Sequence, residues 1–191
     1  IVYDMANILK NFKKFETAIE YYNEVISETK KFDISYAELL YRRGSCYERI
    51  GEYNKSDQDL LKSLEIKPND AYVLNYLAYS WLERNYKIDV AIEMLERAYK
   101  EESNDPYILD SIGWAYYLIG DFSKAEKFLT EAIKLMPDDP IINDHYGDIL
   151  WMMDRKIQAR YYWKSVLTID DADEDIKRNI NDKLLIGLTK T

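Results

Sequence analysis

The sequence predicts an all-α protein built from helical repeats, on three observations. A small residue recurs at intervals of 38, 34, 35 and 34 residues, at Ala6, Gly44, Ala78, Gly113 and Gly147. Apolar and small residues keep similar offsets around these positions. The stretch 173–188 places an apolar residue at every fourth position, which is typical of an amphipathic helix. A period of about 34 residues indicates stacked units rather than one globular core.

The best-defined unit surrounds Gly113. Small residues that let two helix backbones approach alternate there with bulky residues that fill the space around them: Leu109, Ile112, Gly113, Tyr116, Gly120, Phe122, Ala125, Leu129, Ala132 and Pro137. This pattern resembles the tetratricopeptide repeat and is similar to bacterial repeat proteins of mostly unassigned role. The resemblance implies antiparallel helix pairs stacked into a right-handed superhelical solenoid. It also implies a binding scaffold, without catalytic activity, whose inner face holds a peptide or a partner helix.

The repeat pattern divides the chain into units. An incomplete first unit with a long linker spans residues 1–34, and four units and a capping helix with its tail follow: residues 35–70, 71–105, 106–139, 140–172 and 173–191. About four extra residues lie near 27–33, where the absence of Gly and Pro favours a longer helix. Because the first helix is already under way at Ile1, we expect further repeats upstream in a longer protein.

The terminal stretch predicts a lid over the last repeat. Ile176, Ile180, Leu184 and Leu188 form one apolar stripe, and residues 173–175 are all acidic, as a helix N-terminus favours. The end of a repeat array exposes apolar surface that the next repeat would have covered, so a helix with one apolar face suits this place. A docking helix for a partner is the alternative.

Composition excludes several functions. The net charge is −9, and residues 103–175 carry 15 acidic and 7 basic side chains, which disfavours nucleic acid as a partner and favours a basic or neutral protein segment. No apolar run approaches the roughly 18 residues that a membrane-spanning helix needs. Cys46 is the single cysteine, so no internal disulfide forms. That fits the cytoplasm as the default, and a periplasmic chain whose signal peptide has been removed is the alternative.

A second stripe on the first helix of each unit is predicted to line the inner face. It lies about 100° from the packed side of that helix. The candidate partner-binding residues on it are Tyr41, Asn75, Tyr79, Leu82, Asp110, Trp114, Tyr117, Asp144, Asp148 and Trp151. A merely solvated helix face would be Lys and Glu, so a line of rings favours partner binding. Packing against the adjacent repeat is the alternative for Trp114 and Tyr117.

Three carboxylates on this stripe predict the chemistry of the partner. Asp110, Asp144 and Asp148 are spaced to face one another across neighbouring helices, where a Lys or Arg of a partner would fit. The alternative is that they are solvated surface charges. We therefore expect a protein or peptide partner with basic and apolar residues.

Catalysis is not predicted. His145 is the single histidine and shares a helix face with Asp148, but without a second His or a nearby Cys it is expected on the groove surface rather than on a metal. Ser111 is likewise assigned to the groove surface rather than to a nucleophile. The sequence indicates no catalytic residue, no cofactor and no metal site.

Two other functions remain open. One is a self-associating structural array, a homo-oligomer with outer contacts from Tyr21, Tyr22, Tyr161 and Tyr162. The other is a targeting arm of a larger enzyme or of an envelope-assembly protein.

Overall fold

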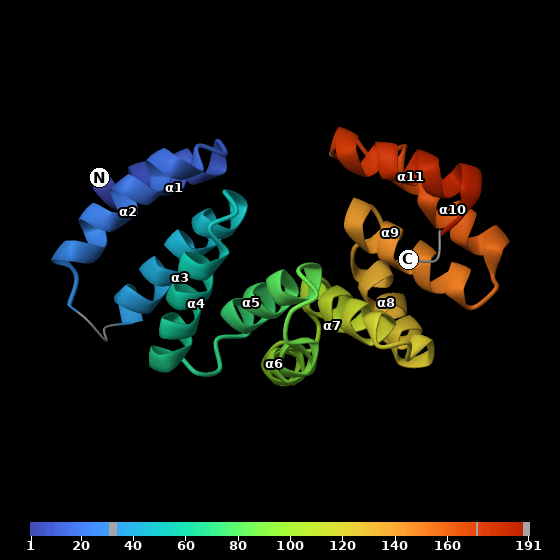
Figure 1. Cartoon of the computed structure of the whole chain (residues 1–191), viewed down its shortest axis with the longest axis horizontal. Helices are drawn as coiled ribbons and strands as arrows, with labels where there is room; N and C mark the ends of the chain where they lie inside the picture. The colour runs from blue at the N-terminus through green and yellow to red at the C-terminus, as the bar shows by residue number, and fades with distance from the viewer. Residues whose placement is uncertain (31–33, 171, 189–191) are drawn as a thin grey trace. The chain divides into compact units, whose positions relative to one another are not determined.

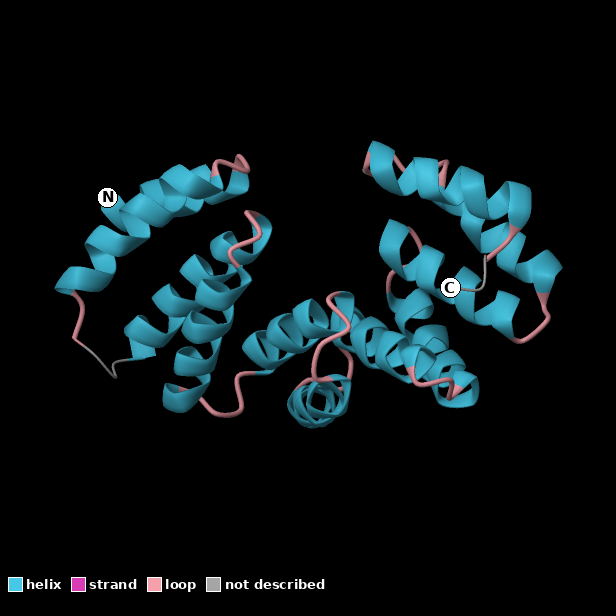
Figure 2. Ribbon diagram, viewed as in Figure 1, coloured by secondary structure: helices cyan, strands magenta, loops and turns pink. Residues whose placement is uncertain are grey.

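The structure is a computed structural model that describes residues 1–30, 34–170 and 172–188. In these ranges all regular secondary structure is helical and no strand occurs (Figures 1 and 2). The helices cluster into two compact units, Ile1–Glu101 and Glu102–Thr191. The prediction of an all-α repeat protein is confirmed.

The first unit is a series of helix pairs joined by short turns. Its helices are α1 (Val2–Asn11), α2 (Phe15–Glu28), α3 (Ile34–Arg49), α4 (Tyr53–Ile66), α5 (Ala71–Glu83) and α6 (Ile88–Glu101). Each helix packs against the next in the chain, and α3 also contacts α5. This second kind of contact stacks one hairpin on the next.

The second unit follows the same plan and ends in a single helix. Its helices are α7 (Pro106–Leu118), α8 (Phe122–Leu135), α9 (Pro140–Met152), α10 (Lys156–Val166) and α11 (Glu174–Ile186). Consecutive helices pack together, and α7 also contacts α9. The first helices of neighbouring hairpins therefore lie side by side in this unit.

Close approach of paired helices explains the small residues of the repeat. A Cβ atom at Gly113 would overlap Leu129, and one at Gly147 would overlap the ring of Trp163. Leu129 and Trp163 are fully buried. The period that predicted the fold thus marks the points where a bulky residue of the second helix presses on the backbone of the first.

The starts of α7 and α9 are encoded by the same dipeptide. Asp105 and Asp139 each accept hydrogen bonds from two backbone amides of the first helical turn, at 2.9 and 3.0 Å. A proline follows each aspartate, at a position where the missing amide hydrogen costs nothing. These caps fix where the two inner helices of the second unit begin.

The lid predicted at the C-terminus is confirmed as α11, which packs against α10. Ile180 is fully buried, and Glu174 and Asp175 lie in the first helical turn, where the helix dipole favours acidic side chains.

The longer helix expected from the extra residues near 27–33 is found in α3, which has 16 residues against 13 in α5, α7 and α9, and not in α2. Helix α2 ends at Glu28, and Thr29 is extended, with ψ 137°. The Thr29 hydroxyl donates a hydrogen bond to the Val25 carbonyl at 2.8 Å. This bond caps a free carbonyl of the last turn, as such hydroxyls often do at helix ends. Residues 31–33 lie outside the described residues.

The outer contact expected of Tyr22 is also wrong. Tyr22 is fully buried in the core of α1, α2 and α3, and its hydroxyl donates a hydrogen bond to Asn7 at 2.7 Å. Tyr161, by contrast, is 67% exposed on α10.

Candidate partner-binding surface

The inner-face residues predicted in the first unit differ in exposure. Tyr41, Asn75 and Tyr79 are half-buried, whereas Leu82 is buried. Tyr41 meets Tyr76 edge to face, with ring centroids 5.8 Å apart. Leu82 was expected to be available to a partner, and this is corrected: its side chain belongs to the core.

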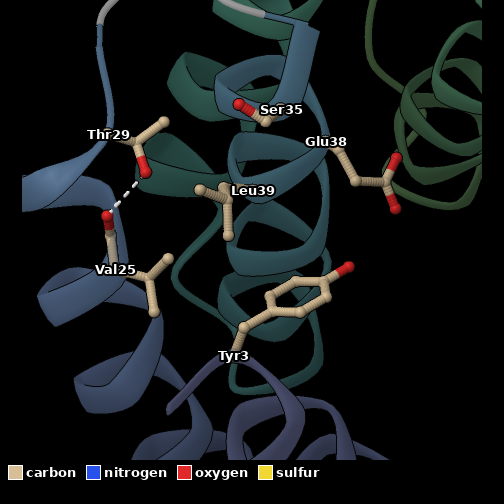
Figure 3. Close-up of a pocket in the computed structure, with 6 residues that line it drawn as sticks. All are labelled: Tyr3, Val25, Thr29, Ser35, Glu38 and Leu39. Atoms are coloured by element: carbon tan, nitrogen blue, oxygen red, sulfur yellow. Dashed lines mark hydrogen bonds between the residues drawn. The ribbon is translucent and has the colours of Figure 1, made fainter. Parts of the chain in front are cut away.

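A pocket in the first unit was not foreseen from the sequence. It has a volume of about 280 Å³ and is lined by residues of α1, α2 and α3 and of the end that follows α2: Tyr3, Val25, Thr29, Ser35, Glu38 and Leu39 (Figure 3). Glu38 forms an ion pair with Arg42 at 2.6 Å. The sequence feature that could have indicated this pocket is the polar pair Ser35 and Glu38 beside the apolar Leu39 near the start of α3.

Three rings stack in the second unit. Trp114 and Tyr117 of α7 are nearly parallel, at 12°, with centroids 4.6 Å apart, and Trp114 stacks on His145 of α9 at 4.1 Å and 11°. Trp114 and Tyr117 are half-buried, so each residue keeps part of its surface in contact with solvent. We call Trp114 and Tyr117 the inner aromatic surface.

His145, which stacks on Trp114, is held in place by a buried contact with a carboxylate. Its Nδ1 lies 2.9 and 3.1 Å from the two carboxylate oxygens of Asp110, and both residues are buried. Burial acts to lower the pKa of His145, but the Asp110 carboxylate outweighs it, so the pKa is raised above 6.5. The expectation of a groove-facing surface histidine is therefore wrong. Ser111, expected on the same surface, is buried as well.

The carboxylates predicted to receive a partner's cation already hold one from this chain. The Lys183 ammonium of α11 donates hydrogen bonds to Asp144 at 2.6 Å and to Asp148 at 2.8 and 2.9 Å. The Trp163 indole also donates to Asp148, at 3.0 Å. A lysine was expected at these carboxylates from a partner, but the lysine found there belongs to this chain. Asp110 and Asp148 are both buried, so neither is open to a partner.

The close packing of these charged and buried groups shifts the pKa values of Asp148 and Tyr117. Burial, and then the Asp144 charge, raise the pKa of Asp148 to about 6, against the opposing effect of Lys183. Burial, followed by the charges of Asp148 and Asp144, raises the pKa of Tyr117 to about 12. The Tyr117 hydroxyl therefore stays neutral at physiological pH and is able to donate a hydrogen bond.

Trp151 is half-buried, and the residues that cover it belong to this chain. A Cβ atom on Gly187 would overlap its ring, so the backbone after α11 lies directly on it. Lys156 and Arg160 lie over the same ring, each 5.4 Å from the centroid. Trp151 was expected to line the inner face for a partner, and in the structure it anchors the lid instead. Lys183 and Gly187, which neither the repeat pattern nor the apolar stripe singles out, are the residues that sequence reasoning missed.

The described residues contain no group of three His, Cys, Asp or Glu side chains placed to hold a metal ion. Among the same residues, no helix is both long enough and apolar enough to cross a bilayer.

Stacked helix hairpins with a lid and a partly exposed aromatic face define a helical-repeat protein. Sequence models of the tetratricopeptide repeat match residues 1–32, 37–70 and 106–139, which is more than half of the chain. The chain belongs to the tetratricopeptide repeat family.

Relatives fall into several kinds of protein. A TPR repeat-containing protein, PA4667 of Pseudomonas aeruginosa, is 33% identical over 110 residues, which are 58% of this chain and 18% of that protein. The human aspartyl/asparaginyl beta-hydroxylase is 24% identical over 182 residues, 90% of this chain and 24% of that protein. The chain spans less than a quarter of the length of these curated relatives.

Solved structures resemble the chain in fold. A thermophilic TPR protein of Thermus thermophilus, TTC0263, matches with a TM-score of 0.79 at 19% identity, over 97% of this chain and 98% of its own. MamA of Desulfovibrio magneticus matches with a TM-score of 0.67 at 20% identity, over 90% and 98%. At this identity the likeness supports the fold alone.

Proposed function

We propose that this chain is a non-enzymatic protein-interaction scaffold that binds a partner segment at the inner aromatic surface of the second unit. Membership in the tetratricopeptide repeat family supports the general role. The observation that supports the particular surface is the ring stack, in which His145 and Asp110 hold Trp114 and Tyr117 in place before any partner arrives. Rings fixed in advance lose little rotamer entropy on binding and are frequent energetic centres of interfaces.

The chemistry of the proposed partner follows from the side chains of the second unit that are free to contact it. An apolar or aromatic side chain packs on Trp114 and Tyr117, with the neutral Tyr117 hydroxyl as a hydrogen-bond donor. Basic residues flank that side chain, drawn by the excess of acidic over basic residues between positions 103 and 175. A basic side chain inserted between Asp110 and Asp148 is not part of the proposal, because His145 and Lys183 already occupy those buried carboxylates.

Peptide display tests the surface directly. Random peptides are selected on the wild-type chain after removal of those that bind a variant with Trp114→Ala and Tyr117→Ala. We expect the selected peptides to bind Tyr117→Ala about tenfold more weakly than wild type, because truncating a central ring typically costs about 1–2 kcal/mol. The matched control is Tyr161→Ala, which removes an exposed ring from α10 and should leave the affinity unchanged. Equal affinity for a Tyr117→Ala variant that melts like the wild type would refute the surface.

A second candidate is supported by the hydroxylase relative. The match extends over 90% of this chain but only 24% of that enzyme, so the chain resembles a repeat region within a longer catalytic protein. In this candidate the chain is the non-catalytic arm that brings a partner to an enzyme. Sequencing the coding region on both sides of residues 1–191 tests it, and an encoded catalytic domain in the same reading frame is the supporting result.

A further inference from the structure

Helix α10 is unusual in its charge. Among the helices of the described residues it alone carries basic side chains and no acidic one, in a chain whose net charge is −9. Lys156, Arg160 and Lys164 follow one another at every fourth position, and we call them the basic row. Since four residues advance a helix by about 6 Å, the row is a line of positive charge with that spacing.

The basic row borders exposed apolar side chains. Ile157 is 88% exposed and Tyr161 is 67% exposed, one turn apart on the face opposite the buried Ala159 and Trp163. Tyr161 is held edge to face by Tyr162, with centroids 5.3 Å apart. Basic and apolar groups on one face of a helix form an amphipathic docking surface.

The end of the row is electrostatically unsatisfied. Lys164 is exposed, and its ammonium group makes no hydrogen bond or ion pair within the part of the chain that the structure describes. Arg160, in the middle of the row, is half-buried, donates a hydrogen bond to the Leu184 carbonyl and lies over the Trp151 ring, so Lys156 and Lys164 are the exposed charges of the row. Lys156 pairs with Asp154 at 3.2 Å, where both side chains are more than half exposed, and such a pair contributes little.

Helix α2 has the opposite composition with the same spacing. It carries four glutamates and no basic residue, and Glu16, Glu20 and Glu24 follow one another at every fourth position on its exposed face. We call these three the glutamate row. Across residues 1–30, 34–170 and 172–188 none of the three forms an ion pair. Like charges four residues apart destabilise a helix, so the row is stabilised by any surface that brings positive charge to it.

We infer that this chain associates head to tail, the basic row of α10 in one copy docking on the glutamate row of α2 in a second copy. The two rows have opposite sign and equal spacing, and Ile157 and Tyr161 add apolar area beside the charges. The contact joins different surfaces of the two molecules, so it extends an assembly beyond a dimer unless rotation closes a ring. The inference goes beyond the proposed peptide binding and involves neither Trp114 nor Tyr117.

Sedimentation velocity on the intact chain tests this contact with two charge-reversed variants. One carries Lys156→Glu and Lys164→Glu on α10, and the other carries Glu20→Lys and Glu24→Lys on α2. We expect the wild type to associate with a constant that falls about tenfold between about 0.05 M and about 0.5 M NaCl, because salt screens exposed charges. Each variant alone should be monomeric, since its own rows now repel.

Mixing the two variants is the decisive arm, because each reversed row then meets a row of opposite charge. The mixture should associate within about twofold of the wild type. The matched control for the α10 variant is Lys127→Glu with Lys134→Glu on α8, which changes the net charge by the same amount and should associate like the wild type. Circular dichroism confirms that every variant is folded.

Three results would overturn the inference. They are a wild type that is monomeric at every concentration in low salt, a mixture that stays monomeric, and association that strengthens with salt. The last result would assign self-association to exposed apolar residues of the N-terminal hairpin, Met5 and Ile8 of α1 and Phe12 directly after it.

Discussion

At the scale of single residues, the contact between a glycine and a ring limits what the repeat tolerates. Gly147 lies against Trp163, which is fully buried and hydrogen-bonded to Asp148. Replacing this glycine with alanine gains about 1 kcal/mol of helix propensity. The added methyl group displaces a ring that has no free space, which typically costs 1–3 kcal/mol and leaves strained hydrogen bonds.

We therefore predict that Gly147→Ala lowers the free energy of unfolding by up to about 2 kcal/mol, measured by urea denaturation. Gly44→Ala is the control, because its new Cβ would lie 3.1 Å from the nearest atom, the Leu60 Cγ, whereas that of Gly147→Ala would overlap the Trp163 ring. Gly44→Ala should be the milder change. A Gly147→Ala variant that is more stable than wild type would contradict the packing described here.

His145 predicts a pH dependence with a definite sign. Its folded-state pKa is raised above 6.5 by Asp110, so the folded protein holds the proton more tightly than the unfolded chain does. The stabilisation from this pair is fully present below pH 6.5 and is lost as the pH rises through the folded-state pKa. Urea denaturation at a series of pH values above 6.5 should show a decline that is absent in His145→Gln. If the free energy of unfolding of His145→Gln fell equally steeply with pH, His145 would not be the cause of the decline.

At the scale of helices, α11 is attached by charge as well as by apolar contact. Lys183 is buried and forms ion pairs with both Asp144 and Asp148. Removing one partner from a buried ion pair leaves an uncompensated charge, which typically costs several kcal/mol.

Lys183→Ala should accordingly lower stability by about 3 kcal/mol in thermal or urea unfolding. The matched control on the same helix is Arg178→Ala, whose side chain is 75% exposed and whose pair with Asp175 is solvated, so it should change stability by less than about 0.5 kcal/mol. Lys183→Ala with the melting temperature of the wild type would show that α11 is held by apolar contacts alone.

The helices themselves were largely predictable from the sequence, whereas the polar contacts between them were not. The spacing of Gly113 and Gly147 located the hairpins, because close helix packing requires small residues at fixed intervals. The apolar stripe through Ile180 located α11. Lys183 lies beside that stripe, and no pattern along one helix says that a lysine will reach two aspartates 35 and 39 residues away.

The inner stripe illustrates the same limit. The spacing of Trp114 and Tyr117 predicted a shared face, and the structure stacks them. The burial of Asp110 and His145 depends on α7 and α9 lying side by side, which a single helical period does not encode. The end of α2 at Glu28 depends on a local hydrogen bond from Thr29 that competes with helix continuation.

At the scale of the whole molecule, the chain is a series of neighbour contacts grouped into two compact units. In such an array each hairpin is stabilised mainly by the hairpins beside it, so a local defect should stay local. Hydrogen–deuterium exchange of Gly147→Ala should show lost protection in α9, α10 and α11, with α1 and α2 unchanged. Equal loss of protection in both units would instead indicate one cooperative body.

The central claim is that Trp114 and Tyr117 bind the partner, and the four tryptophan indoles of the chain report on it most directly. A display-selected peptide is titrated into ¹⁵N-labelled protein, and the indole N–H signals are followed by nuclear magnetic resonance. We predict that the Trp114 signal moves progressively with peptide, while that of Trp163, fully buried and bonded to Asp148, stays in place. Saturable peptide binding that leaves the Trp114 signal unmoved would contradict the account.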